Sequence, residues 1–186
     1  MKRILSILSA VILVFSMAAC QSSGRISSPA DEKPEKVNAP GSNGASKPTS
    51  KEPPELKILD STCIGIVANK GTYSWTYDNG DGTQTGVCAD SSHPLQWQEF
   101  LIPMTTADRS VELYFDVEPQ EITIRCWSDT YWGKVDAEEE NATLSGNRLE
   151  LKDGGYIYEV VAKWTGENLA AEGTAYYGFY VIKDDH

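Results

Sequence analysis

Residues 151–164 read LKDGGYIYEVVAKW, and this stretch carries the strongest signal for the fold. From Tyr156 to Trp164, large apolar residues recur with the two-residue period of a half-buried β-strand. Leu151, Gly154 and Tyr156 form the L-x-x-G-x-Y arrangement that is typical of a tyrosine corner in an immunoglobulin-like sandwich. We therefore expect 156–164 and the last β-rich run, AYYGFYVI at 175–182, to be the F and G strands of such a sandwich.

Strand signals extend over most of residues 56–186. Alternation of apolar and polar side chains predicts strands at 111–117 and 122–127, and no window shows sustained helical periodicity. QWQEFLIPM, residues 96–104, is compatible with a short turn. Short strands separated by turn residues predict an all-β, immunoglobulin-like antiparallel β-sandwich for this region. The other predicted strands are 62–68, 72–78, 83–89 and 148–151.

The N-terminus predicts export and lipidation. Residues 1–19 combine Lys2 and Arg3 with an apolar run shorter than the roughly 20 residues that cross a bilayer, so we expect a signal peptide. MAAC at 17–20 resembles a bacterial lipobox, which implies cleavage before Cys20 and a diacylglycerol on its sulfur. The alternative is a conventional signal peptide with Cys20 merely near the cleavage site. We expect a lipid-anchored protein on the extracellular face of the cell membrane.

Composition separates a tether from a domain. Residues 21–55 hold six of the nine prolines and little that could form a core, so we expect a disordered tether over 20–55. Residues 56–186 carry 9 basic and 22 acidic residues, a net charge of −13. Nucleic acid is therefore not an expected partner, because it needs a basic patch.

YDNGDGTQTG, residues 77–86, resembles part of a calcium-binding loop. In an EF-hand alignment, however, the first ligand position is Tyr77 instead of aspartate, and the twelfth is Cys88 instead of glutamate. We therefore expect a hairpin turn at Asn79-Gly80 or Asp81-Gly82, without a metal ion or another cofactor. The remaining alternative is a weak surface cation site made of Asp78 and Asp81.

The other reactive side chains make no familiar site. With Cys20 lipidated, Cys63, Cys88 and Cys126 allow either one disulfide and one free thiol or three buried thiols. No close cysteine pair supports a zinc site with His93.

The chain shows no catalytic motif, so we expect it not to be an enzyme. Cys88 or Ser92 with His93 is the one triad-like combination, and neighbours in sequence rarely face one another on a strand. Consecutive carboxylates can hydrolyse glycosides but in a loop are more typical of a solvated surface. The alternative of a cell-wall-active hydrolase would use Asp136, Glu138, Glu139 and Glu140.

CWSDTYWGK, residues 126–134, contains our candidate ligand-binding residues, Trp127, Tyr131 and Trp132. Strand parity directs Trp127 outward, and exposed aromatic rings mark binding sites for sugars or peptides. The alternative is that these rings cover the sandwich as a small second core.

Five segments together resemble a known kind of domain: YSWTYDNGDG (73–82), ADSSHPL (89–95), RCWSDTYWG (125–133), LKDGGYIYEVVAKW (151–164) and GTAYYGFYVI (173–182). They are similar to a small extracytoplasmic domain of Firmicutes, found in lipoproteins and at the extracellular end of some BlaR-type membrane sensors. The resemblance implies an immunoglobulin-like sensing or interaction module on a Gram-positive membrane, with no catalytic residues to transfer.

We therefore expect a lipid-anchored binding or sensing module. Its partner would be a cell-wall glycan, a peptide or a membrane protein, in addition to the membrane itself. Besides the hydrolase, a structural or immunity-type lipoprotein remains an alternative. A pocket with two carboxylates about 5 to 9 Å apart would favour the hydrolase.

Overall fold

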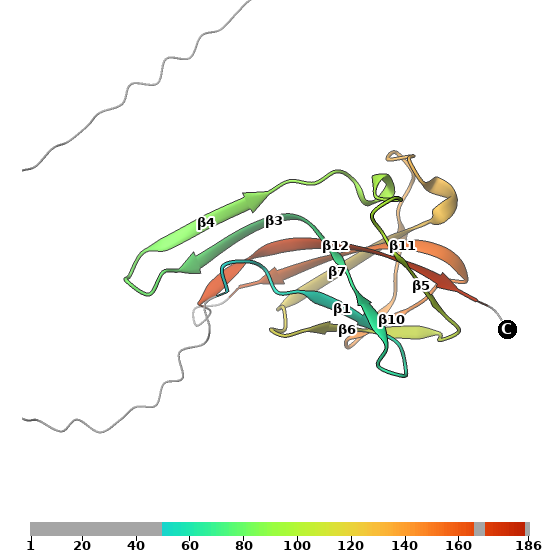
Figure 1. Cartoon of the computed structure of the whole chain (residues 1–186), viewed down its shortest axis with the longest axis horizontal. Helices are drawn as coiled ribbons and strands as arrows, with labels where there is room; N and C mark the ends of the chain where they lie inside the picture. Colours follow the sequence, from blue (N-terminus) through green and yellow to red (C-terminus); the bar gives the residue numbers. More distant parts are fainter. Residues whose placement is uncertain (1–49, 166–169, 185–186) are drawn as a thin grey trace, which may run out of the picture. The chain divides into compact units, whose positions relative to one another are not determined.

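The computed structural model describes residues 50–165 and 170–184, which form an all-β sandwich of two largely antiparallel sheets (Figure 1). The predicted signal peptide, Cys20 and the tether up to residue 49 lie outside the described residues. Two short 3-10 helices are η1 (Pro94–Gln96) and η2 (Asp129–Tyr131). The strands are β1 (Leu56–Leu59), β2 (Gly65–Val67), β3 (Asn69–Asp78), β4 (Gln84–Ala89), β5 (Pro103–Thr106), β6 (Ser110–Phe115), β7 (Glu121–Ser128), β8 (Glu140–Asn141), β9 (Leu144–Ser145), β10 (Arg148–Glu150), β11 (Gly154–Trp164) and β12 (Ala171–Lys183).

The strand order is that of an immunoglobulin-like sandwich, as the sequence predicts. In the five-stranded sheet, β1, β6, β10 and β9 follow the A-B-E-D order, and β2 lies outside β1. In the seven-stranded sheet, β12, β11 and β7 follow the G-F-C order, so the segments predicted as F and G are paired neighbours. Strands β2 to β5 are inserted between the A and B positions. Of these, β3 and β4 extend the second sheet beyond β12, and β5 pairs with β12 in parallel.

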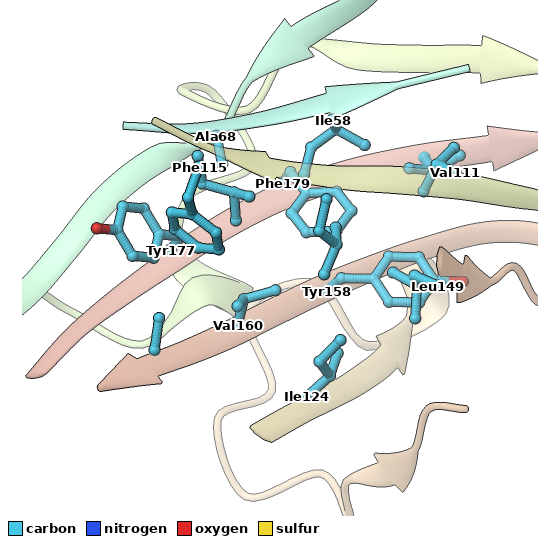
Figure 2. Close-up of a cluster of buried hydrophobic side chains, with 14 of the residues drawn as sticks. Ile58, Ala68, Val111, Phe115, Ile124, Leu149, Tyr158, Val160, Tyr177 and Phe179 are labelled. Atoms are coloured by element: carbon cyan, nitrogen blue, oxygen red, sulfur yellow. The ribbon is translucent and has the colours of Figure 1, made fainter. Parts of the chain in front are cut away.

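The main core lies between the two sheets (Figure 2). The rings of Tyr158 and Phe179 stack with centroids 5.3 Å apart, and Phe115 packs edge-on against Trp164 at 5.4 Å. Even-numbered residues of β11 from Tyr158 to Trp164 face this core, while Ile157 belongs to a separate cluster. The alternation read from the sequence therefore assigns the faces of β11 correctly.

The corner tyrosine is Tyr158, so the assignment of this role to Tyr156 was wrong. Tyr158 is fully buried, and its hydroxyl oxygen accepts a hydrogen bond from the backbone N–H of Lys152 at 3.0 Å. Burial raises the pKa of Tyr158. The half-buried Tyr156 instead lies beneath the ammonium group of Lys152, 5.7 Å from its ring centroid. Both tyrosines have the same strand parity, so periodicity alone does not distinguish them.

We expect Tyr158→Phe to lower the free energy of unfolding by about 1–2 kcal/mol, because the Lys152 N–H would lose its acceptor. Urea denaturation measures this loss. Tyr156→Phe is the matched control and should cost less than about 0.5 kcal/mol, since its hydroxyl lies in a more exposed position. Equal losses in the two variants would contradict the assignment of the corner to Tyr158.

The first strands differ from the prediction for residues 62–68. Only β2 forms there, because the chain turns sharply just before it. The Asp60 carboxylate accepts hydrogen bonds from the backbone N–H groups of Thr62 (2.8 Å) and Ile64 (3.0 Å), and Cys63 has a φ of 60°. Strands β1, β5, β8 and β9 were not predicted, since each has four residues or fewer and shows no clear period.

Residues 50–55 pack against the sandwich, although their composition placed them in the tether. Pro53 is buried, and the Trp75 indole N–H donates to the Ser50 carbonyl oxygen at 3.0 Å. The Tyr177 hydroxyl donates to the Pro54 carbonyl oxygen at 2.6 Å. Long-range contacts therefore hold a segment that has almost no apolar pattern of its own.

Strands β3 and β4 form the hairpin predicted from YDNGDGTQTG. Gly80 and Gly82 have φ angles of 81° and 84°, which glycine adopts without strain. The carboxylates of Asp78 and Asp81 accept hydrogen bonds from the backbone N–H groups of Gly80 (2.7 Å) and Thr83 (2.9 Å). These side chains thus stabilise the turn. Across the part of the chain that the structure describes, no group of three metal-ligating side chains occurs.

Candidate functional site

The aromatic loop after Cys126 folds back over the outer face of the seven-stranded sheet. Cys126 faces the main core, and Trp127 points to the opposite side of β7, as its parity predicts. That side is covered, so Trp127 is only 2 % exposed. Trp127 therefore lies on the expected face but is not exposed, because parity gives the face of a sheet but not what packs on it.

A second core accounts for the burial of Trp127. Its indole N–H donates to the Ala137 carbonyl oxygen at 3.3 Å, and the His93 ring packs against it edge-on at 4.8 Å. Trp127 and Trp132 thus belong to a small second core, which was the alternative interpretation, whereas Tyr131 does not. The buried members of this core are Leu95, Trp97, Leu101, Trp127 and Ile157, with Trp132, Ala137 and Tyr180 packed around them.

Gly71 and Gly178 allow close packing of residues 92–101, the segment that covers the second core. A Cβ atom on Gly71 or Gly178 would lie 2.7 or 2.4 Å from the Trp97 ring, so the indole rests directly on the backbone of β3 and β12. The Trp97 indole N–H donates to the Ser92 hydroxyl at 2.9 Å. His93 is the N-cap residue of η1, and its Nδ1 accepts a hydrogen bond from the backbone N–H of Leu95 at 3.2 Å. Residues 92–101 therefore form a cover for the outer face of the sheet.

The structure places the other two candidate residues at the border of this second core. Trp132 is half-buried and packs edge-on against Tyr180 with ring centroids 5.5 Å apart. Tyr131 is 39 % exposed, and the Lys134 ammonium lies over its ring, 5.5 Å from the centroid. Trp127, Tyr131 and Trp132 are therefore neighbours, but they do not present three free ring faces for stacking.

A buried ion pair lies beside the second core, on the same face of the sheet. Glu159 is 5 % exposed and its carboxylate binds the Arg125 Nε, while a second guanidinium nitrogen binds Glu139 at 3.1 Å. Burial alone would lower the pKa of Arg125, but the hydrogen bonds to Glu159 and Glu139 outweigh it and raise the pKa. The same guanidinium lies 5.6 Å from the Trp127 ring.

In the acidic run of the hydrolase alternative, two carboxylates, Glu139 and Glu140, bind basic side chains. Glu139 binds Arg125, and the carboxylate of Glu140 accepts a hydrogen bond from the Lys152 ammonium at 2.6 Å. The hydrogen bond to Glu140 raises the pKa of Lys152. A glycosidase needs one carboxyl group to give a proton and a second to act as base or nucleophile. Glu139 and Glu140 are instead arranged as ion-pair partners.

The three described cysteines are free thiols. Cys63 and Cys88 are exposed, whereas Cys126 is buried and burial raises its pKa to about 11. The Cys88 thiol donates to the Ser74 hydroxyl, with the sulfur 3.6 Å from the oxygen, while the His93 ring packs on Trp127. A nucleophile–base pair of Cys88 with His93 is therefore not formed.

His93 gives the domain an expected sensitivity to acid. Partial burial lowers its pKa from the usual 6.5, against the opposing influence of Glu159. The unfolded chain therefore takes up this proton more readily than the folded chain, so the His93 contribution to stability is lost as pH falls below about 6.5. Protonation also removes the Nδ1 lone pair that caps η1.

We expect His93→Asn to flatten the dependence of the melting temperature on pH between about 7 and 5. Asparagine keeps a side-chain acceptor at the N-cap of η1 but does not titrate. The measurement compares thermal melts of the two proteins at several pH values. Parallel pH profiles would show that protonation of His93 is not coupled to unfolding.

An open cleft of about 710 Å³ lies where β2 passes into β3. Trp97 and Phe100 line one part of it, and polar groups of Asn69 and Lys70 line another. The Asn69 side-chain amide donates to the Phe100 carbonyl oxygen at 3.1 Å, and the Lys70 ammonium donates to the Pro53 carbonyl oxygen at 2.9 Å. These bonds join the start of β3 to the cover segment and to residues 50–55.

A second cavity of about 270 Å³ shares Val67 and Asn69 with this cleft. Around the two cavities, three large apolar side chains are mostly exposed: Val67 by 53 %, Phe100 by 69 % and Ile102 by 77 %. We call Val67, Phe100, Ile102 and the two cavities the apolar groove. Each of these three exposed apolar side chains lines at least one of the two cavities.

The groove also carries acidic groups. Glu52 and Glu55 line the larger cavity, and Glu52 lies 3.4 Å from the Lys70 ammonium. The groove therefore combines apolar anchoring positions with a surplus of negative charge.

The groove was not predicted from the sequence. The main sequence signal for the groove is FLI at 100–102, three consecutive apolar residues within QWQEFLIPM. Only Leu101 points into the second core, whereas Phe100 and Ile102 are exposed. A run of three apolar residues without periodicity does not reveal which of them is buried.

Comparisons with known proteins do not identify a family. No protein-family model, curated protein or solved structure matches this chain. Within residues 50–165 and 170–184, no helix has the length and apolar character needed to span a membrane.

Proposed function

We propose that the protein is a lipid-anchored, extracytoplasmic binding or sensing module of a Gram-positive bacterium. The signal peptide pattern, the MAAC sequence and the resemblance to Firmicutes lipoproteins support this location. The observation that carries the binding role is the apolar groove, in which Val67, Phe100 and Ile102 are each more than half exposed beside an open cleft. Exposed apolar side chains around a cleft are typical of an interaction site.

The partner we propose for the groove is a protein segment with apolar side chains next to basic residues. Phe100 and Ile102 supply apolar contact, and Glu52 and Glu55 favour positive charge. The net charge of −13 over residues 56–186 favours the same partner through long-range attraction. A glycan is a weaker candidate, because Trp127 is buried and Lys134 covers part of the Tyr131 ring.

The hydrolase and the structural lipoprotein are less well supported. Two of the four carboxylates of the acidic run, Glu139 and Glu140, bind basic side chains, which does not favour them as the acid and the base of a glycosidase. A purely structural role does not explain why Phe100 and Ile102 are exposed beside a cleft, since burial would stabilise both side chains.

Binding of a labelled peptide to the full chain tests the groove. The probe peptide alternates leucine-phenylalanine pairs with lysine. A comparison peptide has glutamate in place of each lysine. We expect the lysine peptide to bind more tightly. The double substitution Phe100→Ser and Ile102→Ser should weaken its binding about tenfold or more, since apolar contact area is lost. Glu55→Gln should weaken it less, and mainly at low salt.

Val135→Ser is the matched control, because Val135 is 42 % exposed but does not line the groove. It should leave peptide binding unchanged. Equal binding of the lysine and glutamate peptides, or full binding by the double variant, would overturn the proposed site. The lipid anchor is tested separately: a Cys20→Ala chain should lose incorporation of labelled fatty acid in cells.

A further inference from the structure

Strand β4 forms an open edge of the seven-stranded sheet (Figure 1). Among the described residues, β3 is the strand that pairs with it, in continuous register from Asp78↔Gln84 to Tyr73↔Ala89. The Asn79 N–H donates to the Thr83 carbonyl oxygen at 2.9 Å, so these two residues form a hydrogen-bonded pair. In an antiparallel ladder every second pair of opposite residues is hydrogen-bonded in this way. Odd-numbered residues of β4 therefore bond to β3, and the backbone groups of Gln84, Gly86 and Cys88 point away from the sheet.

This edge lacks the features that usually prevent strand pairing. The six residues QTGVCA contain no charge and no proline, and the register has no bulge. The other outer strands of the described sandwich are short or otherwise protected. β2 has three residues, β8 and β9 have two each, and the four-residue β5 begins with Pro103. The part of β7 that β8 leaves open begins with Glu121.

The ends of β4, in contrast, are acidic. Asp78 and Asp81 lie at the hairpin turn, and Asp90 follows the strand directly. All three side chains are exposed. Pairing with a second copy would bring like charges near one another in either direction: Asp81 near Asp90 if antiparallel, and the two Asp81 side chains near each other if parallel. The charges therefore disfavour self-association and favour a strand with positive ends.

We propose that β4 accepts an extended segment of another protein as an added strand, uncharged in its middle and basic at both ends. The backbone N–H and C=O groups of Gln84, Gly86 and Cys88 would bond to this segment, as in β-augmentation. Asp81 and Asp90 would pair with its terminal basic residues. This interaction surface is separate from the apolar groove, and it does not depend on the groove being a binding site.

Amide hydrogen exchange of the full chain tests the proposal. The probe is a peptide of alternating threonine and valine with one lysine at each end. At saturating peptide, exchange at Gln84, Gly86 and Cys88 should slow roughly tenfold or more, whereas Thr85 and Val87, already bonded to β3, should change little. The same peptide with glutamate at both ends should give less protection. N-methylation of the peptide amides that face β4 should abolish protection, while methylation of the alternate amides should not.

Protein variants test binding at the β4 edge independently of binding at the apolar groove. Gly86→Pro removes an outward-facing N–H, which an edge strand tolerates, and should abolish peptide protection. The Phe100→Ser and Ile102→Ser protein should keep it. The methylated peptides give the same test on the unaltered protein, so the result does not depend on folding of the proline variant. Absence of protection, or equal protection by the glutamate-ended peptide, would overturn the proposal. Protection without peptide, accompanied by a dimer in sedimentation, would assign the edge to a second copy instead.

Discussion

Trp127→Ala is expected to lower the free energy of unfolding by about 3–5 kcal/mol, the largest effect we predict for a single substitution. Trp127 is 2 % exposed in the second core, where its removal would leave a cavity beside the His93 ring. The N–H bond to the Ala137 carbonyl would also be lost. A typical domain is stable by about 5–15 kcal/mol, so the variant should be close to unfolding at moderate temperature. Urea denaturation followed by circular dichroism measures the loss.

Two controls distinguish a packing role from a ligand-binding role. Trp127→Phe keeps most of the ring and should cost less than the alanine variant. Tyr131→Ala should cost less than about 1 kcal/mol, because this side chain is 39 % exposed. A Trp127→Ala protein with full stability would show that the second core does not form as described. It would also restore Trp127 as a candidate ligand-binding residue.

Arg125→Met is expected to cost about 3 kcal/mol, because it leaves the buried carboxylate of Glu159 without its partner. Methionine can retain much of the contact of the arginine stem with the sheet. The lost free energy of unfolding therefore comes mainly from removing the positive charge. Glu159→Met should cost less, since Arg125 is partly exposed and retains Glu139. With both substitutions, the site becomes apolar and much of the stability should return.

A double-mutant cycle in urea measures the coupling between the two residues. We expect a coupling free energy of about 2 kcal/mol for Arg125 with Glu159. Glu139→Gln is the control, with an expected loss below about 1 kcal/mol, because the Glu139 carboxylate is exposed. If Arg125→Met were no more costly than Glu139→Gln, Glu159 would not depend on the ion pair for its burial.

Local sequence signals were reliable wherever the pattern was long. β11 shows its two faces over more than eight residues, and its pairing with β12 follows from the expected F and G positions. The hairpin between β3 and β4 was predicted from Gly80 and Gly82, which take the positive φ angles that turns require. These features depend on backbone geometry and on neighbours in the sequence.

The candidate site was predicted less well. Parity correctly directed Trp127 away from the main core, but the residues that cover it come from 92–101, a segment without a clear period. Tyr156 and Tyr158 share one parity, and the one that bonds to the Lys152 backbone is distinguished by depth in the core. The apolar groove depends on which of Phe100, Leu101 and Ile102 faces inward.

The sequence by itself determined the all-β class, the faces of the long strands and the position of the β3–β4 turn. These properties follow from side-chain alternation and from the conformational freedom of glycine, which are local. Tertiary structure alone decided that Trp97 rests on Gly71 and Gly178, and this contact holds the segment that buries Trp127. The same segment leaves Phe100 and Ile102 exposed. Burial on the outer face of a sheet depends on distant residues, because a strand specifies its two faces but not the segment that covers each of them.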